Sequence, residues 1–242
     1  MKLYYEENDA LTDYLKDLNN EIKILKMLSD NKNSIKFYGT YDENNEKVLI
    51  MEKCDKNLIE LIKERGKGME IEEIKNKLKD LNKLFRLIQD ENIIHGDLKL
   101  ENFLIKYTDN KKAEYRIKLC DYGVKKFKSQ SNGIFNGLKE TFDTIAPEII
   151  LGKTNSYEKT VDIFSLGIIL YQLSHNLKHP FGDNYIQISK VYTTNYEEDN
   201  LTVEFDKSIS NINFKDLIAK MIKLNPENRL KWNEYFDHPF FE

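Results

Sequence analysis

The sequence predicts an α+β protein in two lobes, a small β-rich lobe followed by a larger and mainly helical one. Short runs rich in β-branched and aromatic residues occur early in the chain, and apolar residues recur with helical period through most of the remainder. We expect the boundary near Cys54 to Asn57, which gives a first lobe of residues 1–54 and a second of residues 55–242. A chain of 242 residues is long enough to bury a core in such an arrangement.

The first lobe is expected to contain one helix and one β-hairpin. From Ala10 to Leu28, leucine and isoleucine recur every three or four residues, the spacing of a helix with one buried stripe. The runs 35–41 and 47–52 are rich in β-branched or aromatic residues and predict two strands. The polar segment 42–46 between them predicts the turn that makes these strands a hairpin.

The second lobe is expected to be mostly helical, with two strands near its start. Helical periodicity covers 57–65, 71–89, 161–174, 213–224 and 231–236, and strand-like runs cover 103–106 and 115–120. The segment 123–145 shows neither period. Because structureless loops longer than about 12 to 15 residues are uncommon in compact domains, this segment is a candidate functional loop.

Charge and composition narrow the possible partners. The chain has 37 basic and 41 acidic residues and a net charge of −4, so we expect no nucleic-acid partner. No apolar run reaches the roughly 18 residues of a membrane span, and the acidic start does not resemble a signal peptide. We therefore expect no membrane partner and a cytoplasmic location, with the nucleus not excluded. Cys54 and Cys120 are expected to be reduced thiols.

Two polar islands carry the chemistry that the sequence suggests. In "HGDLKLEN" (95–102), Asp97, Lys99 and Asn102 follow a predicted helix, and in "LCDYG" Asp121 follows a predicted strand. Phosphoryl transfer could use such a set: one Asp orients a hydroxyl, Asn and the other Asp hold Mg²⁺ through oxygen, and Lys neutralises the phosphoryl charge. For any one of these residues taken alone, turn capping is the better explanation.

The islands belong to an ordered set of motifs that resembles the eukaryotic protein kinase family. That family carries H-R-D-L-x-x-x-N, D-F-G and A-P-E signatures, and this chain reads "HGDLKLEN", "DYG" (121–123) and "APE" (146–148). Further on, "VDIFSLGIILY" (161–171) resembles the family's central helix, and the segment 224–241 resembles its closing segment. The resemblance covers nearly the whole chain and implies a kinase-like fold with a truncated first lobe, and ATP and Mg²⁺ as cofactors.

The resemblance assigns roles within the second lobe. Asp97 is implied as the residue that accepts the substrate hydroxyl proton, and Lys99 as a contact of the γ-phosphate, with Lys at this position pointing to the serine/threonine branch. Asn102 and Asp121 are implied as metal ligands. The remaining assignments are structural or concern the substrate loop, and involve Thr141, Glu148, Asp162 and Arg229.

In the first lobe, the resemblance implies that Glu21 is the ion-pairing glutamate of the regulatory helix. Met51 falls at the gatekeeper position, and Glu52 to Cys54 fall at the hinge that binds adenine through backbone groups. The apolar stack that runs through active kinases is matched by Leu25, Phe37, His95 and Tyr122, so His95 is expected to be a packed side chain and not a base. No role is expected for His175 and His179.

The family's glycine-rich loop does not occur in these 242 residues. The interval from Lys2 to Glu21 is close to the family's usual interval between its strand lysine and the glutamate, so Lys2 is expected to be that lysine, with the chain beginning inside its strand. We expect the ATP phosphates to lose the backbone donors of that loop, and since removing one such donor typically costs about 10²-fold in rate, the activity of this chain is in question.

Three smaller departures concern regulation and the substrate loop. Gly96 replaces the catalytic-loop arginine, so a phosphate on Ser129 or Ser131 would lack its usual cationic partner, and we expect activity that does not depend on it. A large rise in rate on phosphorylation would contradict this expectation. Tyr122 replaces phenylalanine, which keeps aromatic packing, and Glu140 stands where glycine usually precedes Thr141.

Three functions compete at this point. The first is a serine/threonine kinase that transfers the γ-phosphoryl group of MgATP to a protein hydroxyl, with the oligomeric state unknown. The second is a pseudokinase or fragment that acts as a nucleotide-binding or docking scaffold. The third is a small-molecule phosphotransferase, for which His-Gly-Asp is the ordinary form of the loop, but the A-P-E motif, Asp162 and Arg229 argue against it.

Overall fold

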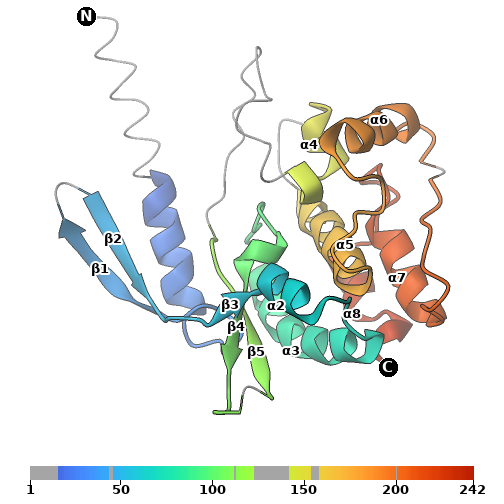
Figure 1. Ribbon diagram of the computed structural model, residues 1–242. Helices are drawn as coiled ribbons and strands as arrows, with labels where there is room; N and C mark the ends of the chain where they lie inside the picture. Colours follow the sequence, from blue (N-terminus) through green and yellow to red (C-terminus); the bar gives the residue numbers. More distant parts are fainter. Residues whose placement is uncertain (1–15, 44–45, 112, 123–141, 154–157, 200) are drawn as a thin grey trace, which may run out of the picture.

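The computed structural model describes residues 16–43, 46–111, 113–122, 142–153, 158–199 and 201–242. Strands and one helix occupy the first part of the chain, and helices dominate the rest (Figure 1). The α+β fold class predicted from the sequence is therefore confirmed. No helix within the described ranges combines the length and the apolar character needed to cross a membrane.

The first part of the described chain is a helix and a hairpin. Residues 16–28 are helical, which agrees with the predicted helix as far as it is described. The hairpin consists of β1 (Phe37–Glu43) and β2 (Glu46–Met51), which pair antiparallel with an irregularity between Phe37 and Gly39. The helix lies beside this hairpin (Figure 1). Its Leu25 and Leu28 are fully buried, so the helical stripe read from the sequence is the packed face.

A second sheet has the order β3-β4-β5 and is antiparallel throughout. Its strands are β3 (Lys56–Asn57), β4 (Phe103–Tyr107) and β5 (Tyr115–Leu119). The sequence predicted the second and third of these, whereas β3 is too short to show a period. The loop before β1 joins this sheet through a parallel bridge between Ser34 and Leu119. This bridge connects the loop that leads into β1 with the end of β5.

Two helices precede the first polar island. Helix α2 (Leu58–Arg65) begins at Asn57, whose side chain accepts from the Glu60 N–H while the Glu60 carboxylate accepts from the Asn57 N–H. It ends at Gly66, whose φ of 66° is the left-handed conformation that glycine adopts at low cost. Helix α3 (Ile71–Asp90) buries six apolar side chains on one face, as its periodicity predicts. Both predicted helices are confirmed.

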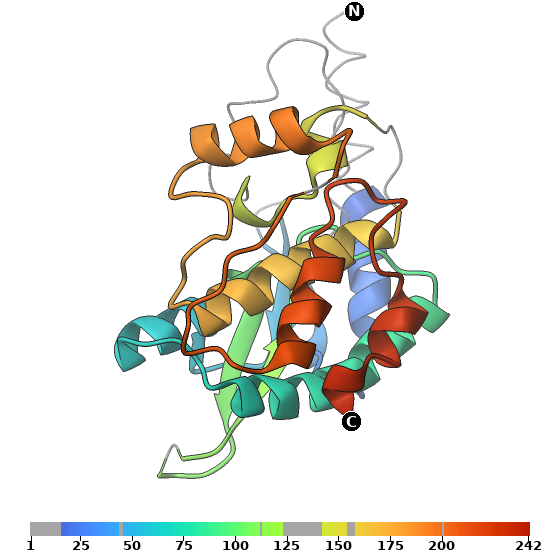
Figure 2. The same ribbon diagram turned by 90° about the vertical axis from the view of Figure 1, so that its right-hand side faces the viewer.

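The second lobe is centred on α5 (Thr160–Ser174). Fourteen of its residues are buried, and it packs against α3 and against α7 (Ile212–Met221) (Figure 2). Gly167 lies at the contact with the end of α7: a Cβ atom there would come within 2.6 Å of Ile222 Cγ2 and 2.8 Å of Met221 Cβ. The short helix α8 (Trp232–Phe236) completes the predicted set.

Two helices were not predicted. Helix α6 (Tyr185–Asn195) buries only Ile188 and Tyr192, so its apolar periodicity is weak. Its start did carry a signal, because the Asn184 side chain caps the helix by accepting from the N–H groups of Ile186 and Gln187. Helix α4 (Pro147–Ile150) has only four residues, too few to show a helical period.

Candidate functional site

A buried carboxylate holds the backbone of the loop that carries the first polar island. Asp162, at the start of α5, accepts hydrogen bonds from the N–H groups of His95 and Gly96, both at 2.8 Å. Only 1% of Asp162 is exposed. Gly96 has a φ of 72°, a conformation that favours glycine. The glycine that departs from the family motif therefore fits the backbone geometry of its position.

The three polar residues of this loop lie together. The Lys99 ammonium is 3.2 Å from a carboxylate oxygen of Asp97, and the Asp97 side chain is almost fully buried. The Asn102 side-chain nitrogen donates to the Asp97 carbonyl at 2.9 Å. This bond fixes the orientation of the Asn102 amide. The turn Leu100–Asn102 is a short 3₁₀ helix directly before β4.

Asp121 follows β5 and lies next to this loop, because the Cys120 N–H donates to the Asn102 carbonyl at 3.0 Å. Its φ of 61° is uncommon for a residue other than glycine and marks a backbone held by its surroundings. Burial raises the pKa of Glu21, and the negative charge of Asp121 raises that pKa further.

His95 and Tyr122 pack behind these polar groups. Their rings are 5.4 Å apart, and both side chains are buried. The Asp97 N–H donates to His95 Nδ1 at 3.4 Å, so His95 Nε2 donates to the Cys120 carbonyl at 3.1 Å. Both ring nitrogens are engaged with backbone groups, which suits a packing residue. Leu25 and Phe37, the other two members of the expected stack, are buried as well.

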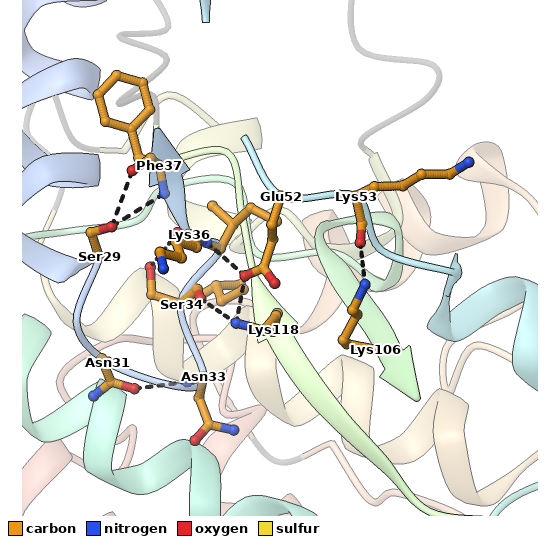
Figure 3. A network of polar contacts seen from close by, with 12 residues as sticks. Ser29, Asn31, Asn33, Ser34, Lys36, Phe37, Glu52, Lys53, Lys106 and Lys118 are labelled. Atoms are coloured by element: carbon orange, nitrogen blue, oxygen red, sulfur yellow. Dashed lines mark hydrogen bonds and ion pairs between the residues drawn. The ribbon is translucent and has the colours of Figure 1, made fainter. Parts of the chain in front are cut away.

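The expected hinge follows β2, and its side-chain contacts were not foreseen. Glu52 forms a 2.5 Å ion pair with Lys118 of β5, and the Lys118 ammonium also donates to the Ser34 carbonyl at 3.1 Å (Figure 3). Lys106 donates to the Lys53 carbonyl at 2.7 Å. In the sequence, only the place of Lys118 between Ile117 and Leu119 sets it apart, and its burial and partners become visible only in the structure. Met51 is 39% exposed at the end of β2.

The two cysteines, Cys54 and Cys120, are both free thiols. Burial, followed by the charge of Glu52, raises the pKa of Cys54 to about 11. Burial and the charge of Asp121 raise the pKa of Cys120 to about 12. Because the thiolate is the reactive form, neither residue is suited to act as a nucleophile at neutral pH.

Farther from the polar island, a buried ion pair anchors the segment that contains the A-P-E motif. Two Arg229 nitrogens donate to the two Glu148 carboxylate oxygens at 2.7 and 2.8 Å. The remaining guanidinium donors reach the carbonyls of Lys223, Thr160 and Leu224. All five N–H donors of this arginine are therefore satisfied.

The same segment is held at two further points that the sequence did not indicate. Ser165 donates to the Thr144 carbonyl at 2.7 Å. The Phe181 N–H donates to His179 Nδ1 at 3.2 Å, so His179 Nε2 donates to the Asp143 carbonyl at 2.9 Å. Burial lowers the pKa of His179 to about 4. No role was expected for His179 from the sequence, but its ring supports the chain just before the A-P-E motif.

Several residues named from the sequence lie outside the described residues: Lys2, Gly123, Ser129, Ser131, Glu140 and Thr141. The structure does bring together Asp97, Lys99, Asn102 and Asp121, with Glu21 close enough to Asp121 to sense its charge. Within the described ranges, no three or more His, Cys, Asp or Glu side chains form a metal cluster. The two oxygen donors Asn102 and Asp121 suit Mg²⁺, which takes one or two protein oxygens and completes its shell with phosphate and water.

Comparison with known proteins identifies a protein kinase domain. The model of the protein kinase domain matches residues 1–241. A serine/threonine-protein kinase/endoribonuclease, ire-1, from Caenorhabditis elegans is 26% identical over 96% of this chain and 24% of its own length. A probable serine/threonine-protein kinase, nek3, from Dictyostelium discoideum is 30% identical over 93% of this chain and 19% of its own. Calcium-dependent protein kinase 27 from Arabidopsis thaliana is 28% identical over 93% of this chain and 45% of its own.

The order of strands and helices and the match to the family model both define a protein-kinase-like fold. With a family model that matches almost the whole sequence, the chain belongs to the protein kinase family. The chain spans less than half the length of each of the curated relatives described above.

Proposed function

We propose that this chain transfers the γ-phosphoryl group of MgATP to a serine or threonine hydroxyl of a protein. The observation that carries the proposal is the grouping of Asp97, Lys99 and Asn102 on one loop whose backbone is fixed by Asp162. Phosphoryl transfer depends mainly on positioning and charge stabilisation, and this loop supplies both. The serine/threonine relatives support the class of acceptor.

In this proposal each polar side chain of the second lobe has one task. Asp97 orients the substrate hydroxyl and accepts its proton as the oxygen attacks the γ-phosphorus and the bond to the β-phosphate oxygen breaks, which releases ADP. Lys99, already 3.2 Å from Asp97, offsets the negative charge of the transferred group. Asn102 and Asp121 hold Mg²⁺, which when bound neutralises phosphate charge.

The first lobe supplies the nucleotide contacts. Glu52 and Cys54 bind adenine through their backbone groups, and Met51 lies at the back of that site. Glu21 pairs with Lys2, and this pair positions the phosphates. We further propose that the two lobes meet after residue 54, where the chain leaves β2 and enters the second sheet.

Substitution of Asp97 tests this function directly. We expect Asp97→Ala to reduce phosphoryl transfer to a basic protein substrate by roughly 10²- to 10⁴-fold, because the proton acceptor is lost. Nucleotide affinity, measured by calorimetry, should stay within about twofold. Asp55→Ala is the matched control, since the Asp55 carboxylate accepts from the Tyr107 N–H beside the hinge and takes no part in the proposed transfer. Transfer that persists unchanged in Asp97→Ala would remove Asp97 from the mechanism.

A docking scaffold that binds nucleotide without turnover is the second candidate. The observation that favours it is the missing G-x-G-x-x-G pattern in these 242 residues. Nucleotide-dependent thermal stabilisation with no transfer by the unmodified chain would support the scaffold over the enzyme.

A further inference from the structure

The hydrogen bonding between the chain segments of β1 and β2 becomes irregular at the hinge. Lys36 and Glu52 face each other one step beyond the Phe37–Met51 pair, and the Glu52 N–H donates to the Lys36 carbonyl at 2.9 Å. In a regular antiparallel ladder, two such residues exchange both of their N–H···O bonds. Here the Lys36 N–H donates to the Glu52 side-chain carboxylate at 2.7 Å. The carboxylate thus takes the donor that the Glu52 backbone carbonyl would normally accept.

Because the carboxylate takes the Lys36 N–H, the strand pairing no longer uses the backbone carbonyl of Glu52. Within the described part of the chain, the Glu52 carbonyl accepts no hydrogen bond. The neighbouring hinge groups are used differently: the Lys53 carbonyl accepts from Lys106, and the Asp55 N–H donates to the Ile105 carbonyl. Hydrogen bonds therefore hold the hinge backbone on both sides of the Glu52 carbonyl, which itself accepts none within the described part of the chain.

Lys118 keeps the Glu52 side chain in this position. Its ammonium lies 2.5 Å from the same carboxylate oxygen that accepts the Lys36 N–H, and it also donates to the Ser34 carbonyl (Figure 3). The side chains of Lys118 and Glu52 are only 10% and 13% exposed. A charged pair that is this well shielded is weakly screened and keeps its geometry.

We propose that Glu52 and Lys118 are positioning residues for nucleobase recognition: the Glu52 carboxylate, held by Lys118, keeps the Glu52 carbonyl free for an exocyclic amino group of the base. This inference rests on the proposed nucleotide-binding function and adds to it an ion pair, Glu52 with Lys118, that governs base selectivity. Without the carboxylate, the Lys36 N–H closes the ladder onto the carbonyl, which turns that oxygen toward Lys36 and away from the base.

The test compares two ligands that differ only in that amino group. Adenosine carries the 6-amino donor, and purine riboside has hydrogen in its place. We expect the unmodified chain to bind adenosine roughly three- to tenfold more tightly, the value of one net hydrogen bond, as measured by calorimetry without Mg²⁺. Glu52→Ala should abolish this preference, and Lys118→Met should reduce it. Lys106→Met, the same change at a lysine that contacts the hinge but not Glu52, should preserve it.

A second measurement tests the role of the Glu52 carboxylate without any ligand. Scalar coupling across a hydrogen bond, between the Lys36 amide nitrogen and the backbone carbonyl carbon of residue 52, should be absent from the unmodified chain and present in Glu52→Ala. Coupling in the unmodified chain, or an adenosine preference that survives in both Glu52→Ala and Lys118→Met, would overturn the proposal. Failure of the unmodified chain to bind adenosine would count against the proposed function, and the coupling would still decide the role of Glu52.

Discussion

A single oxygen separates Tyr122 from the phenylalanine usual at its position, and that oxygen has a partner. The Tyr122 hydroxyl is completely buried and donates to Ser34 Oγ at 2.8 Å, with the Leu119 carbonyl at 3.2 Å. Ser34 also accepts from Lys118 through its carbonyl. Lys118 in β5 and Tyr122, which directly follows Asp121, therefore hold the loop that comes after the first helix.

Tyr122→Phe should lower the free energy of unfolding by about 1 to 2 kcal/mol, because a buried hydroxyl of Ser34 loses its donor. Ser34→Ala in the Tyr122→Phe background should cost much less than in the unmodified chain, with a coupling of about 1 kcal/mol. Urea unfolding measures all four proteins. Tyr235→Phe, which removes a buried hydroxyl bonded to Asn82, is the control. Additive losses in the Tyr122 and Ser34 pair would contradict the contact.

Another residue-scale prediction concerns His179 and pH. Its pKa of about 4 in the folded chain lies below the 6.5 of an ordinary histidine, so the unfolded chain binds this proton first as pH falls. The stabilisation is complete above pH 6.5 and is lost progressively between 6.5 and about 4. The loss should reach roughly 2 to 3 kcal/mol.

The measurement is urea unfolding across this pH range, with His179→Gln as a reference that cannot titrate there. Burial raises the pKa of the neighbouring Asp143, which therefore favours the folded state as pH falls and works in the opposite direction. Subtracting the His179→Gln curve removes that contribution. An identical pH dependence in both proteins would show that His179 is not held neutral.

At the scale of elements, the close approach of α5 to the end of α7 depends on Gly167. Gly167→Ala places a Cβ within 2.6 Å of Ile222, so we expect a loss of about 1 to 3 kcal/mol in the free energy of unfolding. Ile222→Ala alone also destabilises by leaving a cavity. The double variant, compared with both single variants by urea unfolding, should be more stable than the sum of the two losses predicts. Removal of Ile222 Cγ2 relieves one of the two close contacts, and the added methyl group fills part of the cavity. Simple additivity would contradict this packing.

Elements with strong periodicity could be predicted from the sequence, and elements defined by single contacts could not. Helix α3 and the strands β4 and β5 follow from repeated apolar positions, whereas α6 is held by only two buried side chains. The polar residues of the site were identified from motifs. Lys118 and His179 were not, because their roles depend on which backbone groups tertiary packing brings to them.

At the scale of the whole molecule, the Arg229–Glu148 pair connects the end of the chain to the segment before α5. Arg229→Lys keeps the charge but cannot supply five donors in one plane, so several buried acceptors lose their partners. We expect a loss of about 3 to 5 kcal/mol, measured by thermal and urea unfolding.

Arg65→Lys is the matched control for that change. Arg65 also forms a two-bond pair, with Glu73 at 2.7 and 2.9 Å, but its side chain is 30% exposed. The same substitution there should cost no more than about 1 kcal/mol. Equal losses at the two arginines would show that burial is not what makes the Arg229 pair important.

The hydrogen bonds from His95 and Gly96 to Asp162 also set an order of events during folding. They join residues 67 and 66 positions apart, so the loop that carries Asp97 cannot take its final shape from neighbouring sequence. Contacts between distant residues form late, because long loops must close first. A ribosome that has released only the residues before α5 has already made every polar group of the first island, but not the carboxylate that holds its backbone. We therefore expect the chain to acquire its candidate catalytic geometry only when α5 docks, well after the loop itself has been synthesised.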